Sequence, residues 1–209
     1  MTHPALLALA LLTAPATAQE GPQQPALEDG ETIESELHAD LNSDGMPDLA
    51  YIAVREDFRE LRVVTSYVDE FETGENPVQR LALDTYPLAD ATLTIAGKKT
   101  NVLVLEELTG GTTAILSTHR FRWEEGLGVM RLIGLDATLY SRTFAHDGKE
   151  ASWNLVTGDL ITRTLKLNKG RENRAYDKVG ETRSKRPSPV LVIEESPDGA
   201  SLLGLPDGQ

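Results

Sequence analysis

The sequence predicts an all-β fold, an antiparallel meander of about ten short strands that form either a propeller-blade-like unit or a sandwich. Three observations predict it. Runs rich in Val, Ile, Thr and aromatic residues alternate with polar residues, with the period of two that a half-buried strand shows. Gly, Asn, Asp and Pro bound these runs. Helical periodicity is nearly absent, so we expect few or no helices.

The expected strands follow one another from residue 32 to residue 167. They cover residues 32–39, 49–54, 60–68, 80–86, 91–97, 101–108, 112–123, 129–140, 150–156 and 160–167. The connections at 109–112, 124–128 and 157–159 are short and contain glycine, as connections of adjacent antiparallel strands do. The stretch 58–71 also spaces apolar residues as a helix would, but its β-branched residues favour a strand.

The N-terminal part of the chain divides into two segments ahead of a single β domain at 32–209. Residues 1–18 contain an apolar run from Ala5 to Leu12 and then Ala16-Thr17-Ala18, a pattern that a signal peptidase cuts. We therefore expect a cleaved signal peptide and a periplasmic or secreted protein. No Lys or Arg precedes the run, so the alternative is an apolar N-terminus on a cytosolic protein. Residues 19–31 lack periodicity and predict a disordered leader.

Charge and cysteine content exclude several classes of protein. The chain has a formal net charge of -13 and no cysteine. The charge argues against nucleic acid as a partner, and the lack of cysteine excludes disulfides and thiol nucleophiles. Residues 166–189 hold eight Lys or Arg against three acids. We interpret this basic stretch as a solvated loop, with a docking patch for an anionic partner as the alternative.

The stretch 38–54, HADLNSDGMPDLAYIAV, predicts a calcium loop. Calcium (Ca2+) takes six to eight oxygen ligands in irregular geometry, which acids at alternate positions of one loop can provide. Gly45 permits the positive φ that turns the chain back over the ion. Water would complete the shell. The expected ligands are the side chains of Asp40, Asn42, Asp44 and Asp48 and the main-chain carbonyl of Met46.

Two features separate this loop from the helix-loop-helix calcium hand. Tyr51 stands where that motif needs a bidentate carboxylate, and a strand follows instead of a helix. The stretch resembles the calcium loop of FG-GAP and VCBS repeats, the units of integrin-type β-propellers, in a single copy. The resemblance implies that the loop joins two antiparallel strands. The alternative is a plain hairpin turn, but such a turn has no use for Asp40 and Asp48 at the ligand spacing.

Other candidate sites are weaker. The histidines at 38, 119 and 146 are isolated in sequence, so we do not expect a zinc site. His119 is expected to share a strand face with Ser117, as a satisfied or exposed strand histidine. Phe121 and Trp123 also share a face, and we expect the aromatics to fill the core. The alternative is an aromatic, cationic surface for a glycan or peptide, built by Trp153 with Arg142 and Arg163.

The sequence thus predicts an exported, non-enzymatic, calcium-binding β protein that works by binding or adhesion at the cell envelope. Its partner would be a protein or a glycan, and we expect a monomer without a transmembrane segment. Two alternatives stay open. One is a small envelope hydrolase that uses the ion as a Lewis acid, and the other is a periplasmic inhibitor or assembly factor.

Overall fold

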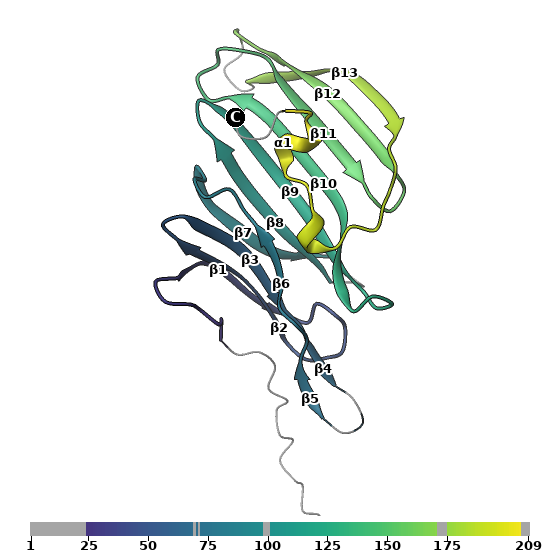
Figure 1. The fold of residues 1–209 in the computed structure, drawn as a ribbon. Helices are drawn as coiled ribbons and strands as arrows, with labels where there is room; N and C mark the ends of the chain where they lie inside the picture. Colours follow the sequence, from purple (N-terminus) through teal and green to yellow (C-terminus); the bar gives the residue numbers. More distant parts are fainter. Residues whose placement is uncertain (1–23, 69, 71, 98–100, 171–174, 206–209) are drawn as a thin grey trace, which may run out of the picture.

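Two antiparallel sheets make up most of the computed structural model, which describes residues 24–68, 70, 72–97, 101–170 and 175–205 (Figure 1). The smaller sheet has the order β1-β2-β3-β6 and the larger the order β13-β12-β11-β10-β9-β8-β7. The all-β prediction is confirmed. The smaller sheet contains β1 (Thr32–Ala39), β2 (Asp48–Arg55), β3 (Phe58–Val64) and β6 (Gln79–Ala82).

The larger sheet is a continuous meander, with each strand next to its neighbour in sequence. A separate two-stranded ribbon pairs β4 (Ser66–Val68) with β5 (Thr73–Glu75). Two short helical turns, η1 (Ile193–Glu195) and α1 (Gly199–Leu202), end the described chain. The larger sheet contains β7 (Ala89–Ala96), β8 (Val102–Gly110), β9 (Thr113–Glu124), β10 (Val129–Ser141), β11 (Gly148–Asn154), β12 (Asp159–Leu167) and β13 (Tyr176–Lys185).

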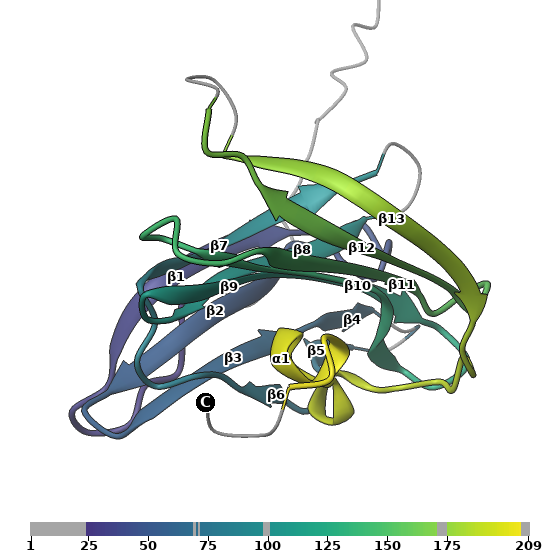
Figure 2. The ribbon, with the colours of Figure 1, turned by 90° about the horizontal axis from the view of Figure 1, so that it is seen from above.

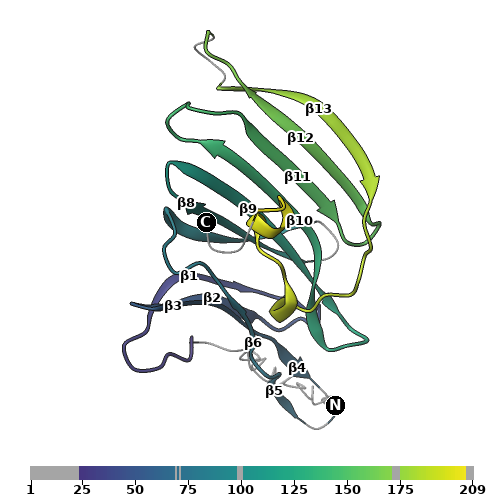
Figure 3. The same cartoon turned by 45° about the horizontal axis from the view of Figure 1, so that its top comes forward.

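The core lies between the two sheets, which face each other as layers (Figure 2). Alternate residues of β2 and β3, such as Ile52 and Leu61, meet Leu105 and Phe121 of the larger sheet, and all four are fully buried. The larger sheet extends past the smaller one, and η1 and α1 cover part of the face that is left (Figure 3). Gly199 packs so closely on β9 that a Cβ there would lie 2.7 Å from Ser117 Cβ.

The sequence predicted that the basic stretch at 166–189 is a loop, but much of it forms strands. It includes the end of β12 and all of β13, which is the last strand of the larger sheet. Its charges pair across strands, as Lys178 does with Glu150 and Lys185 with Asp159, at 2.6 and 2.7 Å. The strand was missed because β13 is mostly exposed on both faces, so it carries no apolar alternation. Residues 171–174 lie outside the described residues.

The segment 24–31 packs against the outer face of the smaller sheet, although the sequence predicted it to be part of a disordered leader. Tyr51 Oη donates to the carbonyl oxygen of Ala26 at 2.9 Å. Arg62 donates to both carboxylate oxygens of Glu31, at 2.7 and 2.8 Å. Order therefore starts earlier than the expected Thr32. The predicted signal peptide, 1–18, and residues 19–23 lie outside the described residues.

A buried arginine joins the two sheets. Arg59 of β3 is 3% exposed and donates to both oxygens of Glu34 on β1 and to one of Glu107 on β8, each at 2.7 Å. Burial works against the charged form of Glu34, but the bonds from Arg59 and from the Ala91 amide lower its pKa below the ordinary value. Arg59 and these two carboxylates therefore link the sheets inside the sandwich. In the described part of the chain, no helix is long and apolar enough to cross a membrane.

Candidate metal and ligand site

The predicted calcium loop connects β1 to β2, as its resemblance to FG-GAP and VCBS loops implied. β1 ends at Ala39 and β2 begins at Asp48. Gly45 has a φ of 88°, so the expected positive φ at this residue is confirmed. Ser43 also has a positive φ, of 66°, which is uncommon for a residue with a side chain. The loop therefore turns back on itself twice within three residues.

The first half of the loop is closed by its own amides. Asp40 accepts hydrogen bonds from the backbone N–H groups of Ser43 and Gly45, at 2.7 and 3.1 Å. Asn42 Oδ1 accepts from the amide of Asp44 at 3.1 Å, and Asp44 Oδ1 accepts from that of Met46 at 2.7 Å. These turns point the oxygen-bearing side chains into the loop. The polar side chains thus organise the loop even without an ion.

Asp48 has a different environment, because its side chain is completely buried at 0% exposure. One oxygen accepts from the amides of Leu41 and Asn42, at 2.6 and 3.2 Å. The other accepts from the amide and the hydroxyl of Ser66, at 2.7 and 2.8 Å. Burial raises the pKa of Asp48, while these four bonds act in the opposite direction. The carboxylate therefore ties the loop to the strand that follows β3.

The structure brings the five predicted ligands into one loop but not onto one point. In the described chain, no three His, Asp or Glu side chains converge as a metal-binding group, so Asp40, Asp44 and Asp48 do not form one. A carboxylate oxygen can accept about two bonds, so Asp48 is saturated, whereas Asp40 and Asn42 retain unused acceptor sites. The donor set suits a hard cation. The Met46 carbonyl accepts no hydrogen bond from the described residues.

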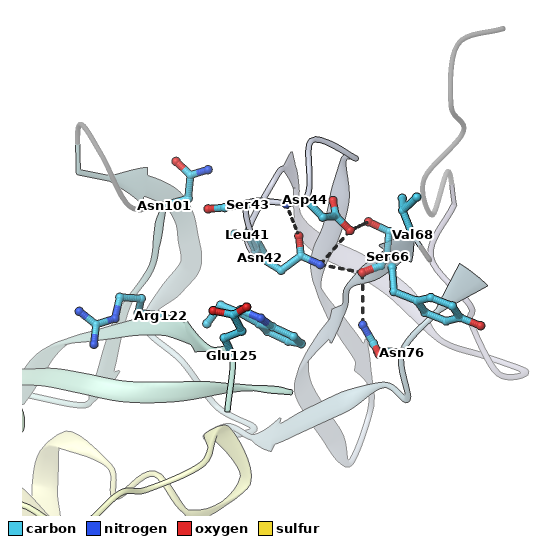
Figure 4. Close-up of a pocket in the computed structure, with 12 residues that line it drawn as sticks. Leu41, Asn42, Ser43, Asp44, Ser66, Val68, Asn76, Asn101, Arg122 and Glu125 are labelled. Carbon is cyan, nitrogen blue, oxygen red and sulfur yellow. Dashed lines mark hydrogen bonds between the residues drawn. The ribbon is translucent and has the colours of Figure 1, made fainter. Parts of the chain in front are cut away.

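A pocket of about 550 Å³ opens beside the loop (Figure 4). We call it the end pocket, because turns and strand ends of both sheets line it. Figure 4 shows Asn42, Asp44, Ser66 and Asn76 on one side, and Arg122 and Glu125 on another. The polar and aromatic part of its lining includes Asn42, Asp44, Asn76, Asn101, Arg122, Trp123 and Glu125. Loop residues 42 and 44 thus serve both the predicted metal site and this pocket.

The side-chain amides of Asn76 and Asn101 help to shape the end pocket. Asn76 Nδ2 donates to Thr65 Oγ1 and to the carbonyl of Ser66, at 3.1 and 3.2 Å. Asn101 Nδ2 donates to the carbonyl of Asp40, which links the start of β8 to the predicted calcium loop. No sequence pattern marked either residue, because an asparagine in a turn has no pattern that separates ligand binding from turn formation.

The histidines lie in separate places. His38 contacts Glu36 at 2.7 Å, and His146 contacts Thr113 Oγ1 at 2.8 Å. His119 is 2% exposed and contacts the carbonyl of Pro197 at 2.9 Å, and burial lowers its pKa. It lines a second cavity, of about 320 Å³, together with Ser117, as their shared strand face predicted. The sequence predicted a satisfied or exposed histidine, but His119 is neither exposed nor fully satisfied, because it is buried and its Nδ1 has no hydrogen-bond partner among the described residues.

The predicted aromatic pair on β9 divides between two roles. Phe121 is fully buried in the core, where its ring stacks on that of His119 with centroids 5.9 Å apart. Trp123 is only partly buried and lines the end pocket. Trp153 lies in the core with Arg186 above its ring, at 4.1 Å from the centroid. Of these aromatics, only Trp123 is placed to contact a ligand in this pocket.

Comparisons of the chain with protein-family models, with curated proteins and with solved structures find no match. The resemblance of residues 38–54 to FG-GAP and VCBS loops therefore stays a prediction.

Proposed function

We propose that the protein is an exported, non-enzymatic calcium-binding β protein that binds a partner at the cell envelope through the end pocket. Calcium would be held by Asp40, Asn42, Asp44 and the carbonyl of Met46, with Asp48 as the fifth ligand. The ion would stiffen the wall that the loop gives to the pocket.

One observation carries the calcium proposal. Asp48 is a wholly buried carboxylate, and no Lys or Arg of the described chain forms an ion pair with it or with the neighbouring Asp40 and Asp44. Buried charges in proteins are normally paired with an opposite charge or bind a metal. Burial raises the pKa of Asp48, and a cation nearby would favour its charged form. A divalent ion would therefore offset the cost of placing three acids in one loop.

The hydrogen bonds of Asp48 set the strength of the expected site. Binding calcium through Asp48 requires the loss of at least one of its four bonds, which lowers the net gain by about 1 kcal/mol or more. The loop also offers no bidentate glutamate. We therefore expect a Kd of about 10⁻⁴ to 10⁻³ M, the range of extracellular calcium modules.

The test is a thermal melt of the full chain in calcium, in magnesium and in EDTA. Calcium at ten times its Kd should stabilise the protein by about 1.4 kcal/mol, a rise in Tm of about 3 to 6 °C. Asp44→Asn should reduce this shift. Asp57→Asn is the matched control, because Asp57 is 81% exposed in the turn between β2 and β3. Equal melting curves in calcium and in EDTA would refute the calcium site.

The end pocket also favours a second candidate, the metal-assisted hydrolase. Arg122 lines the same pocket as Asn42 and Asp44. The Arg122 guanidinium and a calcium ion bound at the loop could therefore act on one substrate. The described lining contains no histidine that could serve as a general base, whereas binding needs no such group. Calcium-dependent turnover of p-nitrophenyl esters or phosphates that Arg122→Ala abolishes would favour the hydrolase over the binding protein.

A further inference from the structure

We propose that the end pocket binds a neutral saccharide. This inference rests on the proposed binding function and names the ligand class of the same site. The pocket, of about 550 Å³, falls within the roughly 300 to 1,000 Å³ of small-molecule sites. It lies where turns of the smaller sheet meet the end of β9. Loops held by a rigid sandwich are a common place for binding residues.

The pocket offers hydrogen-bonding groups that suit hydroxyls. The amide nitrogens of Asn76 and Asn101 are used within the protein, but their Oδ1 atoms accept no hydrogen bond from the described residues. Glu125 is exposed and forms no ion pair with any described residue. A carboxylate accepts, an amide oxygen accepts and an arginine donates. A sugar hydroxyl, which both donates and accepts, can satisfy all of these groups.

Arg122 provides an independent argument for a polar ligand. It lies directly opposite Arg131 in the pairing of β9 with β10, and like charges at opposite positions destabilise a sheet. Arg131 is neutralised by Glu124 at 3.1 Å. Arg122 has no ion pair within the described residues, and it lines the end pocket. The strand therefore presents an unpaired guanidinium at the pocket, where it can donate hydrogen bonds to a ligand.

Trp123 supplies the apolar surface that a sugar ring needs. It packs partly against the hydrophobic core, so its indole is held rigidly, and its remaining surface lines the pocket. Aromatic rings combine a large apolar area with low conformational freedom. The C–H face of a pyranose can pack on such a ring while its hydroxyls reach the surrounding polar groups.

The charges of the pocket favour a neutral sugar over a charged one. The lining carries charges of both signs, with Asp44 and Glu125 against Arg122, so charge complementarity selects neither an anionic nor a cationic sugar. The mixed lining also disfavours a purely apolar ligand, because the polar groups would lose water without gaining partners. A polyhydroxylated, uncharged ring is the chemistry that meets all three conditions.

The test is saturation-transfer difference NMR on the full chain with glucose, galactose, mannose and N-acetylglucosamine, and with galacturonate and glucosamine as charged comparisons. At least one neutral sugar should bind in millimolar calcium. Arg122→Ala and Trp123→Ala should each weaken its binding about tenfold or more. Arg120→Ala is the matched control, because Arg120 lies two residues away on β9 and pairs with Asp136 at 2.7 Å. It should change the affinity by less than about twofold.

Three results would overturn the inference: no neutral sugar binds, only charged sugars bind, or Arg122→Ala binds as well as the wild type. If Trp123→Ala does not fold, Arg122→Ala and Glu125→Ala test the same pocket. Melting curves of the same samples keep the two proposals apart. A calcium shift without sugar binding refutes the saccharide alone, and sugar binding without a calcium shift refutes the calcium site alone.

Discussion

Replacing Asp48 by asparagine tests the structural role of the loop most sharply. The substitution keeps the size of the side chain but exchanges one acceptor oxygen for an NH2 group. The remaining oxygen can still serve the amides of Leu41 and Asn42, and the Ser66 hydroxyl can rotate to accept from the new NH2 group. The backbone N–H of Ser66, which is 1% exposed, loses its partner.

The cost of Asp48→Asn follows from these contacts. One unsatisfied buried N–H costs about 1 to 3 kcal/mol, and the bonds that remain weaken because the acceptor is neutral. The variant no longer buries a charge, which offsets part of this loss. We expect a destabilisation of about 2 kcal/mol, a fall in Tm of about 4 to 8 °C. Urea unfolding in EDTA measures it without any contribution from calcium.

The same measurement on Asp57→Asn is the control, and this exposed residue should change stability by less than about 0.5 kcal/mol. A destabilisation of Asp48→Asn no larger than that of Asp57→Asn would refute the reasoning, because it would mean that the four hydrogen bonds of Asp48 do not hold the loop.

Three further predictions concern the rest of the fold. Arg59→Met should cost about 3 to 5 kcal/mol in urea unfolding, because it leaves two buried carboxylates unpaired. The exposed Arg55→Met should cost little. Arg62 holds the pKa of Glu31 at about 2 instead of 4.5. The contribution of this ion pair to the free energy of unfolding is therefore full above pH 4.5 and is lost as the pH falls toward 2. Urea midpoints of Glu31→Gln should lack this dependence. Gly45→Ala should lower the free energy of unfolding by about 1 kcal/mol, because Gly45 has a φ of 88°. Gly111→Ala is the control, because a Cβ there would meet open space and the φ of Gly111 is not positive. Equal stabilities of the two variants would contradict this prediction.

Several of the strands that the sequence predicted, such as β9, bury mainly alternate residues. β1 matches the expected range 32–39, and β9 and β10 agree with prediction to within one residue at each end. Alternation of apolar and polar residues carries this information, because the core selects for it. β13 and β5 bury little and carry no alternation, so no pattern marked them.

Contacts between distant residues could not be predicted. Glu31 meets Arg62 across a separation of 31 residues, and this pair holds a segment that composition alone marked as disordered. In the loop, the spacing predicted the positive φ of Gly45. It could not indicate that Asp48 would turn to the amides of Leu41 and Ser66, because an acid at a ligand position can equally accept hydrogen bonds. The end pocket was missed because it joins residues from five separate stretches.

Isothermal titration of the full chain with calcium tests the central claim most directly. We predict one binding event with a Kd of about 10⁻⁴ to 10⁻³ M. Asp40→Asn should bind calcium more weakly by about tenfold or more, because it removes the carboxylate at the first position of the loop. Asp57→Asn should bind as the wild type does. No heat at millimolar calcium, or equal heats for Asp40→Asn and the wild type, would contradict a calcium ion in this loop.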